Sequence, residues 1–280
     1  LTLTSLTLSV HDLGTIAYGD ALALQRRLAD DRLSGKLATD LLILCEHPPV
    51  ITLGRGTKTS SLPLDIESLR RRSIEVFEVE RGGDVTYHGP GQLVGYPIFD
   101  LGGHRQDLHW YLRQLEEVLI VALREFDLAA ERNPGYTGVW TSGRKIASIG
   151  VHVKQWVTWH GFALNVTTEL SPFDLIIPCG IPGVVMSSVA AETRGTGVPA
   201  HRRTGFATAE ADLGTAARSA VVRAFESVFG FGKHNDWRGF HSHCPSWPPC
   251  FGPPLRAVPR KPHWGSGRVN DGSSSQAAVR

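Results

Sequence analysis

The sequence predicts an α+β fold in a single domain. Its strand-like segments often follow one another along the chain instead of alternating strictly with helices, which favours local pairing over a doubly wound sheet. The 280 residues are 41% hydrophobic, which is enough to bury one sizeable core. We see no internal repeat, and no apolar run approaches the roughly 18 residues expected of a membrane-spanning helix.

Three segments carry the spacing of amphipathic helices. Apolar residues recur every three or four positions in 17–28, in 108–126 and in 213–228. The first of these segments ends near Asp30, and the second follows Asp107, whose carboxylate suits the N-cap of a helix. We therefore expect three helices.

Six segments rich in β-branched and aromatic residues predict strands. The last two of them are separated only by Lys154 and Gln155, so we expect these two strands to form a hairpin. The six segments are DLLILCE (40–46), VITLG (50–54), IEVFEVE (74–80), LVGYPIF (93–99), KIASIGVHV (145–153) and WVTWHGFALNV (156–166).

The charge of the chain is unevenly distributed. The formal net charge is +2, but residues 233–280 carry +5 and residues 1–232 carry −3. A globally basic nucleic-acid-binding protein would not show this pattern, so we expect no nucleic-acid partner. Residues 233–280 are also rich in proline, glycine and serine without a sustained period, and we expect this tail to be disordered.

The cysteines indicate a reducing environment. Cys45, Cys179, Cys244 and Cys250 are few and unevenly spread, which argues against a disulfide framework and for the cytoplasm. The first residues also lack the basic stretch and compact apolar block of a signal peptide. Because Leu1 is not an initiating methionine, we expect further residues before it.

The most unusual stretch is RGGDVTYHGPGQ, residues 81–92, which holds four glycines among many polar side chains. It fits neither of the glycine-rich patterns that cradle nucleotide phosphates, and no helix start follows it. The cluster His241, His243, Cys244 and Cys250 lacks the paired spacing of zinc ligands. The sequence therefore predicts no bound metal and no cofactor.

Cys179, in IIPCGIPG, is a candidate nucleophile. An apolar run delivers this thiol into a turn of prolines and glycines, where a substrate could approach the backbone and amide groups could hold an oxyanion. A buried structural cysteine remains the alternative, and it is the reading we favour for Cys45. Lys145, His88 and His160 are candidate helpers for the thiol, and each could equally be structural.

Five segments, in order, resemble the octanoyltransferases, also called lipoyl(octanoyl) transferases or lipoate-protein ligase B. They are HPPVITLGR (47–55), RGGDVTYHGPGQLVGY (81–96), GRKIASIGVHV (143–153), WHGFALNV (159–166) and PCGI (178–181). The resemblance covers roughly residues 9 to 232. It implies a single α+β domain over residues 1–232, similar to the catalytic domains of biotin and lipoate protein ligases, with a mixed sheet flanked by helices.

The resemblance also implies an activity. The family transfers an octanoyl group from acyl carrier protein to a lysine on lipoyl domains of 2-oxoacid dehydrogenases and on the glycine-cleavage H protein. Cys179 matches the acyl-accepting cysteine, and Lys145 matches the lysine that favours its thiolate form. The segments that match the acyl-binding site are Arg81, Gly82, Gly83, Asp84, Val85, Thr86, Tyr87 and His88, then Ser148, Ile149 and Gly150, then Gly161, Phe162 and Ala163.

The chemistry agrees with these residues. A thioester donor is already activated, so its transfer through a cysteine needs no ATP, and glycine-lined walls could hold a straight apolar chain. We take Gly82, Gly83, Gly150 and Gly161 as that lining. Three alternatives stay open: an ATP-dependent lipoate or biotin ligase on the same fold, a cysteine hydrolase that uses water as acceptor, and an inactive acyl-binding protein. We expect no membrane association.

Overall fold

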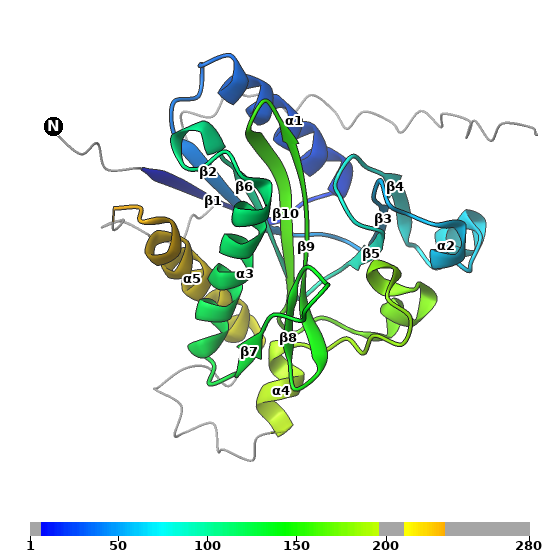
Figure 1. Ribbon diagram of the computed structural model, residues 1–280. Coiled ribbons are helices and arrows are strands. Elements are labelled where there is room, and N and C mark those ends of the chain that lie inside the picture. The colour runs from blue at the N-terminus through cyan, green and yellow to red at the C-terminus, as the bar shows by residue number, and fades with distance from the viewer. Residues whose placement is uncertain (1–6, 196–209, 233–280) are drawn as a thin grey trace, which may run out of the picture. The chain divides into compact units, whose positions relative to one another are not determined.

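The computed structural model describes residues 7–195 and 210–232, and it confirms the predicted α+β class (Figure 1). Within these residues, one mixed sheet has the strand order β1-β2-β6-β10-β9-β8-β7, and a smaller sheet has the order β4-β3-β5. The large sheet contains β1 (Leu8–Thr15), β2 (Asp40–Glu46), β6 (Gln92–Ile98), β7 (Ala130–Glu131), β8 (Val139–Thr141), β9 (Arg144–Lys154) and β10 (Val157–Asn165). The small sheet contains β3 (Val50–Leu53), β4 (Glu75–Glu78) and β5 (Val85–His88).

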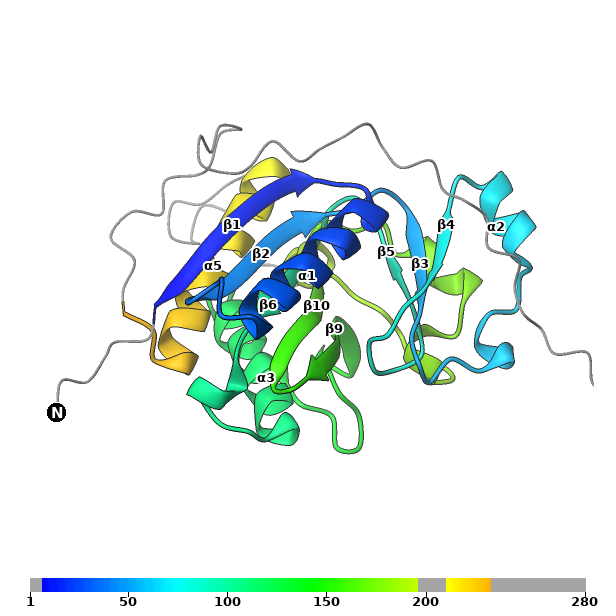
Figure 2. The same ribbon diagram turned by 90° about the horizontal axis from the view of Figure 1, so that it is seen from above.

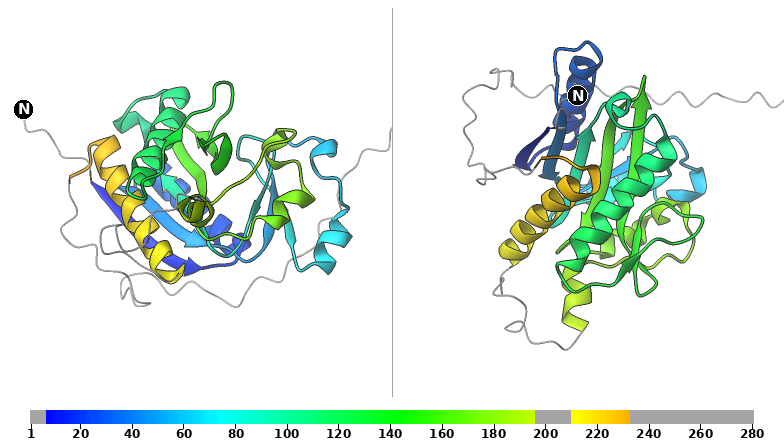
Figure 3. Two further views of the ribbon diagram at one scale, coloured as in Figure 1. Left: turned by 90° about the horizontal axis from the view of Figure 1, so that it is seen from below. Right: turned by 60° about the vertical axis from the view of Figure 1, so that its left-hand side comes forward.

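Helices cover both faces of the large sheet, as Figures 2 and 3 show. The helices α3 (Leu108–Arg124) and α5 (Glu210–Phe229) lie side by side on one face, and α1 (Tyr18–Leu33) packs against β6 and β10 on the other. The two remaining helices, α2 (Ile66–Arg71) and α4 (Val189–Gly195), are short. Among the helices of the described residues, none combines the length and apolarity needed to cross a membrane.

The strand β2 shows why its sequence is almost continuously apolar. Leu42 and Leu44 pack into the core cluster beneath α3 and α5. Because side chains alternate along a strand, Ile43 and Cys45 point to the opposite face, and both are buried. When both faces of a strand are covered, its side chains do not face solvent, so apolar residues are favoured at successive positions.

The three predicted helices are confirmed with small shifts of their ends. The side chain of Asp107 accepts a hydrogen bond from the Trp110 N–H at 3.0 Å, which is the expected N-cap of α3. The first helix continues to Leu33 instead of ending near Asp30. Predicted helix ends are least certain because the last turn depends on local capping and not on the apolar pattern.

The predicted hairpin is confirmed, but its turn lies one residue further along the chain. Lys154 pairs with Val157 across the two strands, so Gln155 and Trp156 form the turn. Their φ values are 48° and 68°, and two successive positive φ values match the twist of a tight hairpin. Trp156, which we expected inside the strand, therefore belongs to the turn.

Several strands were not predicted from the sequence. The strand β1 pairs in parallel with β2, and β5 forms inside the glycine-rich stretch that we treated as a loop. Pairing is also less local than expected, because β6 lies between β2 and β10. Residues 233–280, predicted to be a disordered tail, lie outside the described residues.

Candidate active site

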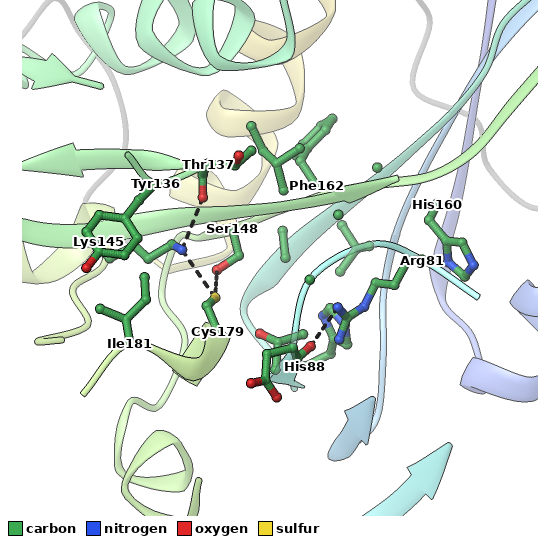
Figure 4. Close-up of a pocket in the computed structure, with 18 of the residues that line it drawn as sticks. Arg81, His88, Tyr136, Thr137, Lys145, Ser148, His160, Phe162, Cys179 and Ile181 are labelled. Atoms are coloured by element: carbon green, nitrogen blue, oxygen red, sulfur yellow. Dashed lines mark hydrogen bonds between the residues drawn. The ribbon is translucent and has the colours of Figure 1, made fainter. Parts of the chain in front are cut away.

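One cavity of about 210 Å³ lies between the β9–β10 hairpin of the large sheet and β5 of the small sheet (Figure 4). It contains most of the residues that the sequence singled out, although they come from distant parts of the chain. Cys179, Lys145 and Ser148 lie together at one end, and Arg81, His88 and His160 lie at the other. The lining also includes Tyr18, Gly83, Asp84, Thr86, Val94, Tyr96, Gly135, Tyr136, Thr137, Ile149, Gly150, Gly161, Phe162, Ala163 and Ile181.

The first end of the cavity brings the two principal candidates together. The Nζ atom of Lys145 donates a hydrogen bond to the Sγ atom of Cys179 at 3.2 Å. The hydroxyl of Ser148 lies 3.7 Å from the same sulfur. An ammonium at this distance from sulfur favours the thiolate by direct Coulomb attraction. The tertiary structure therefore brings together the thiol and the lysine that the sequence singled out.

Cys179 is presented by a strained turn. It belongs to the short 3-10 helix η4 (Pro178–Gly180), yet its own φ of 57° lies in the left-handed region. Non-glycine residues adopt this conformation rarely, and it is concentrated at functional sites. The following N–H, that of Gly180, donates to the carbonyl of Ile177 at 2.9 Å, so it is not available to hold an oxyanion.

A second set of contacts holds this turn against the motif 81–92. The buried carboxylate of Asp84 accepts from the Ser61 hydroxyl at 2.7 Å. A Cβ atom at Gly180 would lie 2.4 Å from Asp84 Oδ2, and the φ of Gly180 is +66°. Only glycine permits this approach, so packing requires a glycine directly after Cys179.

Lys145 is almost entirely buried, with 1% of its surface exposed. Besides the sulfur, its Nζ atom donates to the carbonyl oxygen of Thr137 at 3.3 Å and lies 4.8 Å from the centre of the Trp140 ring. A carbonyl oxygen and an aromatic face both stabilise a cation. This lysine is therefore not a surface charge at a strand end.

The motif 81–92 divides between the cavity and the protein interior. Because β5 alternates, Thr86 and His88 line the cavity, whereas Val85 and Tyr87 pack into a core cluster with Phe173. Gly83 lines the cavity and Gly82 does not. The predicted acyl-binding residues are thus brought together except for Gly82, Val85 and Tyr87, whose side chains or backbone lie behind the wall.

Arg81 lines the cavity, but both terminal nitrogens of its guanidinium already have hydrogen-bond partners. It donates to the carbonyl oxygens of Thr52 and Asp84, both at 2.8 Å, and to the Thr52 hydroxyl at 2.8 Å. A further bond at 3.1 Å reaches the carbonyl of Gly82. Burial lowers the pKa of Arg81 from its ordinary value. We infer that the hydrogen bonds of this side chain hold the glycine-rich turn in place.

The far end of the cavity combines the aromatic ring of Tyr18 and two histidines with the guanidinium of Arg81. Burial, with the neighbouring His47 as a smaller cause, lowers the pKa of His88 to about 3. The Nδ1–H of His88 donates to Gln92 Oε1 at 2.7 Å, and the His88 ring stacks on Tyr18. Burial also lowers the pKa of His160. Both histidines are therefore neutral at physiological pH, which suits an uncharged ligand.

Two of the lining glycines are required for close packing of the backbone, and they do not widen the cavity. A Cβ atom at Gly161 would lie 2.2 Å from the carbonyl oxygen of Gly95. A Cβ atom at Gly150 would lie 2.9 Å from the carbonyl oxygen of Gly82. These glycines let neighbouring backbones close the wall of the cavity, which is a different role from the one that the sequence suggested.

The segment 133–138 also lies at the cavity, although it was not among the predicted site residues. Gly135, Tyr136 and Thr137 line the cavity, and Thr137 supplies a carbonyl oxygen to Lys145. Its sequence, NPGYTG, is a turn signal just before a strand, like the start of the motif 81–92. That signal marked a loop, but only the fold places the loop beside Lys145.

The described residues contain no group of three metal-ligating side chains. The cluster of His241, His243, Cys244 and Cys250 lies outside those residues. What the cavity does offer is a thiol, a buried ammonium and an apolar slot, which together suit covalent transfer of an apolar acyl group.

Comparison with known proteins extends this result. Residues 17–201 match the family model described as the lipoyl protein ligase A/B catalytic domain. The chain is 53% identical over 176 residues to an octanoyltransferase of Gloeobacter violaceus, covering 63% of this chain and 77% of the relative. It is 46% identical over 221 residues to an octanoyltransferase of Nostoc, covering 79% of this chain and 91% of the relative.

Solved structures show the same fold at low sequence identity. Lipoate-protein ligase A bound with ATP aligns with a TM-score of 0.59 and 15% identity, over 83% of this chain and 88% of that one. A bipartite lipoate protein ligase from Thermoplasma acidophilum aligns with a TM-score of 0.58 and 17% identity, over 82% and 87%. The family resemblance and the likeness to lipoate ligases that we predicted are both confirmed.

Proposed function

Because the chain belongs to the octanoyltransferase family and carries a lipoyl protein ligase A/B catalytic domain, we propose that it transfers an octanoyl group from acyl carrier protein to a lysine of a lipoyl domain. The observation that carries this proposal is the 3.2 Å contact between Lys145 Nζ and Cys179 Sγ at one end of an apolar cavity. The acceptors are the lipoyl domains of 2-oxoacid dehydrogenases and the glycine-cleavage H protein.

The first half-reaction moves the acyl group to the enzyme. The Cys179 thiolate attacks the carbonyl carbon of the donor thioester, and the bond from that carbon to the carrier sulfur breaks. The Lys145 ammonium, 3.2 Å from the sulfur, gives a proton to the departing thiolate, which leaves as a thiol, and becomes a neutral amine. The hydroxyl of Ser148 donates to the carbonyl oxygen as it gains charge, a role supported by its position 3.7 Å from the same sulfur.

The second half-reaction reverses these proton movements. The neutral amine of the acceptor lysine attacks the acyl carbon, and the bond to Cys179 breaks. Lys145 takes the proton that the new amide nitrogen loses, so the ammonium and thiolate pair is restored. The two steps balance without ATP, a metal or a redox cofactor.

The octanoyl chain lies along the hairpin. Ser148, Ile149 and Gly150 from β9 and Gly161, Phe162 and Ala163 from β10 form one wall, and Gly83, Thr86 and His88 form the other. At roughly 0.8 kcal/mol for each buried methylene, the chain contributes several kcal/mol of binding. Of the remaining predicted residues, Asp84 holds the cysteine turn, Arg81 holds the motif 81–92, and Gly82, Val85 and Tyr87 support the wall from behind.

The compartment follows from the thiol. Cys45 and Cys179 are both free cysteines, and the proposed reaction needs a reduced sulfur. We therefore place the reaction in the cytoplasm, where thiols stay reduced.

Intact-mass spectrometry tests the whole scheme. Incubation with octanoyl-acyl carrier protein should add one octanoyl group to the enzyme, and an apo-lipoyl domain added next should remove it. The Cys179→Ser variant should accumulate no adduct, whereas Cys45→Ser should behave like the wild type because Cys45 is buried away from the cavity. Loss of the adduct without a lipoyl domain would indicate a hydrolase, and an adduct that no acceptor removes would indicate an acyl-binding protein.

An ATP-dependent ligase is the second candidate, because the fold is shared with lipoate-protein ligase A bound with ATP. Such an enzyme would activate the free acid and release pyrophosphate. Pyrophosphate released from ATP in the presence of free octanoate, undiminished in Cys179→Ser, would favour the ligase.

A further inference from the structure

We propose that Glu116, a buried residue of α3, is a positioning residue for Lys145, an inference that rests on the function proposed above. Glu116 does not line the cavity, and its side chain has no exposed surface. A fully buried carboxylate is costly unless its oxygens have partners. Its partners therefore indicate why the fold retains it.

The two carboxylate oxygens of Glu116 accept hydrogen bonds from different groups. The Oε2 atom accepts from Arg113 Nη1 at 2.6 Å and from Arg132 Nε at 3.1 Å. The Oε1 atom accepts from the backbone N–H of Gly138 at 3.1 Å. Because the two arginines balance the charge, Oε1 serves to anchor the backbone just before β8.

That backbone lies directly against the proposed catalytic lysine. The carbonyl of Thr137, one residue before Gly138, accepts from Lys145 Nζ at 3.3 Å. A Cβ atom at Gly138 would lie 2.9 Å from Lys145 Cε and 2.7 Å from the carbonyl oxygen of Ala147, and its φ is +137°. The segment 137–138 therefore packs tightly against Lys145, and neither can shift without displacing the other.

The anchor has a chemical consequence. Without Glu116 Oε1, the buried N–H of Gly138 would lack a partner, and the segment would move to find one. Thr137 would move with it, and the Lys145 ammonium would lose one of the two acceptors that aim it at Cys179. The thiolate would then form less readily, although neither reacting residue had changed.

Two adjacent carboxylates on α3 provide a matched test. In Glu116→Gln the single amide oxygen should face the two arginines, so the NH2 group, which cannot accept a hydrogen bond, faces the N–H of Gly138 and the anchor is lost. Glu117→Gln is the control, because Glu117 also pairs with Arg132, at 2.7 Å, but does not contact Gly138. The measurement is the rate of Cys179 alkylation by iodoacetamide in the full chain, read by peptide mass mapping so that Cys179 is separated from the other cysteines.

We expect Glu116→Gln to slow Cys179 alkylation at pH 7 about tenfold, with recovery at higher pH, and Glu117→Gln to change it little. In a Lys145→Met background, Glu116→Gln should have no further effect, because its influence passes through the lysine. An unchanged rate in Glu116→Gln, or an equal loss with and without Lys145, would overturn the positioning role.

Failure of the proposed function has a different signature. If wild-type enzyme forms no octanoyl adduct, or if Lys145→Met leaves alkylation unchanged, the role of Cys179 or of Lys145 is wrong, whatever Glu116 does. If Glu116→Gln does not fold, Glu116→Asp carries the same test, because it keeps the charge but withdraws the carboxylate from Gly138 by one methylene.

Discussion

At the residue scale, the site depends on two side chains whose surroundings differ from those of their counterparts elsewhere in the chain. Cys179 is partly exposed at the cavity, whereas Cys45 is fully buried, and burial raises the pKa of the Cys45 thiol well above its ordinary range. Lys145 is buried against sulfur, a carbonyl and an aromatic ring, whereas Lys154 lies exposed at the other end of the same strand. Environment, and not residue type, separates Cys179 from Cys45 and Lys145 from Lys154.

This contrast gives a prediction about Lys145. Replacing it with methionine keeps the length of the side chain but removes the charge beside the sulfur, so alkylation of Cys179 at pH 7 should slow by about tenfold or more. Lys154→Met, in the same strand, should leave the rate unchanged. Iodoacetamide kinetics with peptide mapping measure both. Equal rates in the two variants would remove Lys145 from the activation of the thiol.

At the scale of elements, the β9–β10 hairpin is the main support of the cavity. It supplies Lys145 and six residues that line the proposed acyl slot, and its neighbours β6 and β8 hold it in the sheet. The positive φ of His160, 57° within β10, shows that this strand is not regular where it lines the cavity. Close approach of the hairpin to β6 requires a glycine at position 161, because a Cβ atom there would meet the carbonyl oxygen of Gly95.

The two glycines Gly161 and Gly82 should therefore respond differently to alanine. Gly161→Ala places a methyl group 2.2 Å from the Gly95 carbonyl oxygen, and forcing it in should lower the free energy of unfolding by about 1–3 kcal/mol or more. Gly82→Ala should cost less than about 1 kcal/mol, because its nearest neighbour, the Val151 carbonyl oxygen, is 3.6 Å away. Urea denaturation of both variants measures the difference, and equal losses would contradict this account of the wall.

At the scale of the whole molecule, burial of histidines couples stability to pH. Burial is the largest cause that lowers the pKa of His11, His47, His88, His152 and His160. Each of these side chains is held neutral in the folded protein at a pH where the unfolded chain would bind a proton. Folding therefore opposes protonation, and acid should favour the unfolded state.

The pKa of His88 gives the direction in which stability changes with pH, and the pH range of that change. Its folded pKa of about 3 lies below the unfolded value of 6.5, so stability should fall as the pH falls from about 6.5 towards 3. The slope for one such histidine is about 1.4 kcal/mol per pH unit. Urea denaturation at pH 7, 6 and 5 measures it. His88→Gln should reduce the slope of the free energy of unfolding against pH. His109→Gln should not, because His109 is exposed. Equal slopes in the wild type and the two variants would contradict the prediction.

Local sequence determined much of this protein. The three amphipathic helices, the Asp107 cap, the β9–β10 hairpin and the family segments follow from periodicity and motif, because each is encoded within about twenty neighbouring residues. The same reasoning singled out Cys179 and Lys145 as residues of interest. It left their roles open, since a lone thiol and a lone lysine each have a structural alternative.

Only the tertiary structure brought those two residues together. Lys145 and Cys179 are separated by 34 positions in the sequence, and packing of the small sheet and the cysteine turn against the hairpin brings them into a 3.2 Å contact. Alternation in β5 decided which residues of 81–92 reach the cavity, and the segment 133–138 gained its role only from lying beside Lys145. Such contacts depend on long-range packing, which no local pattern of residues encodes.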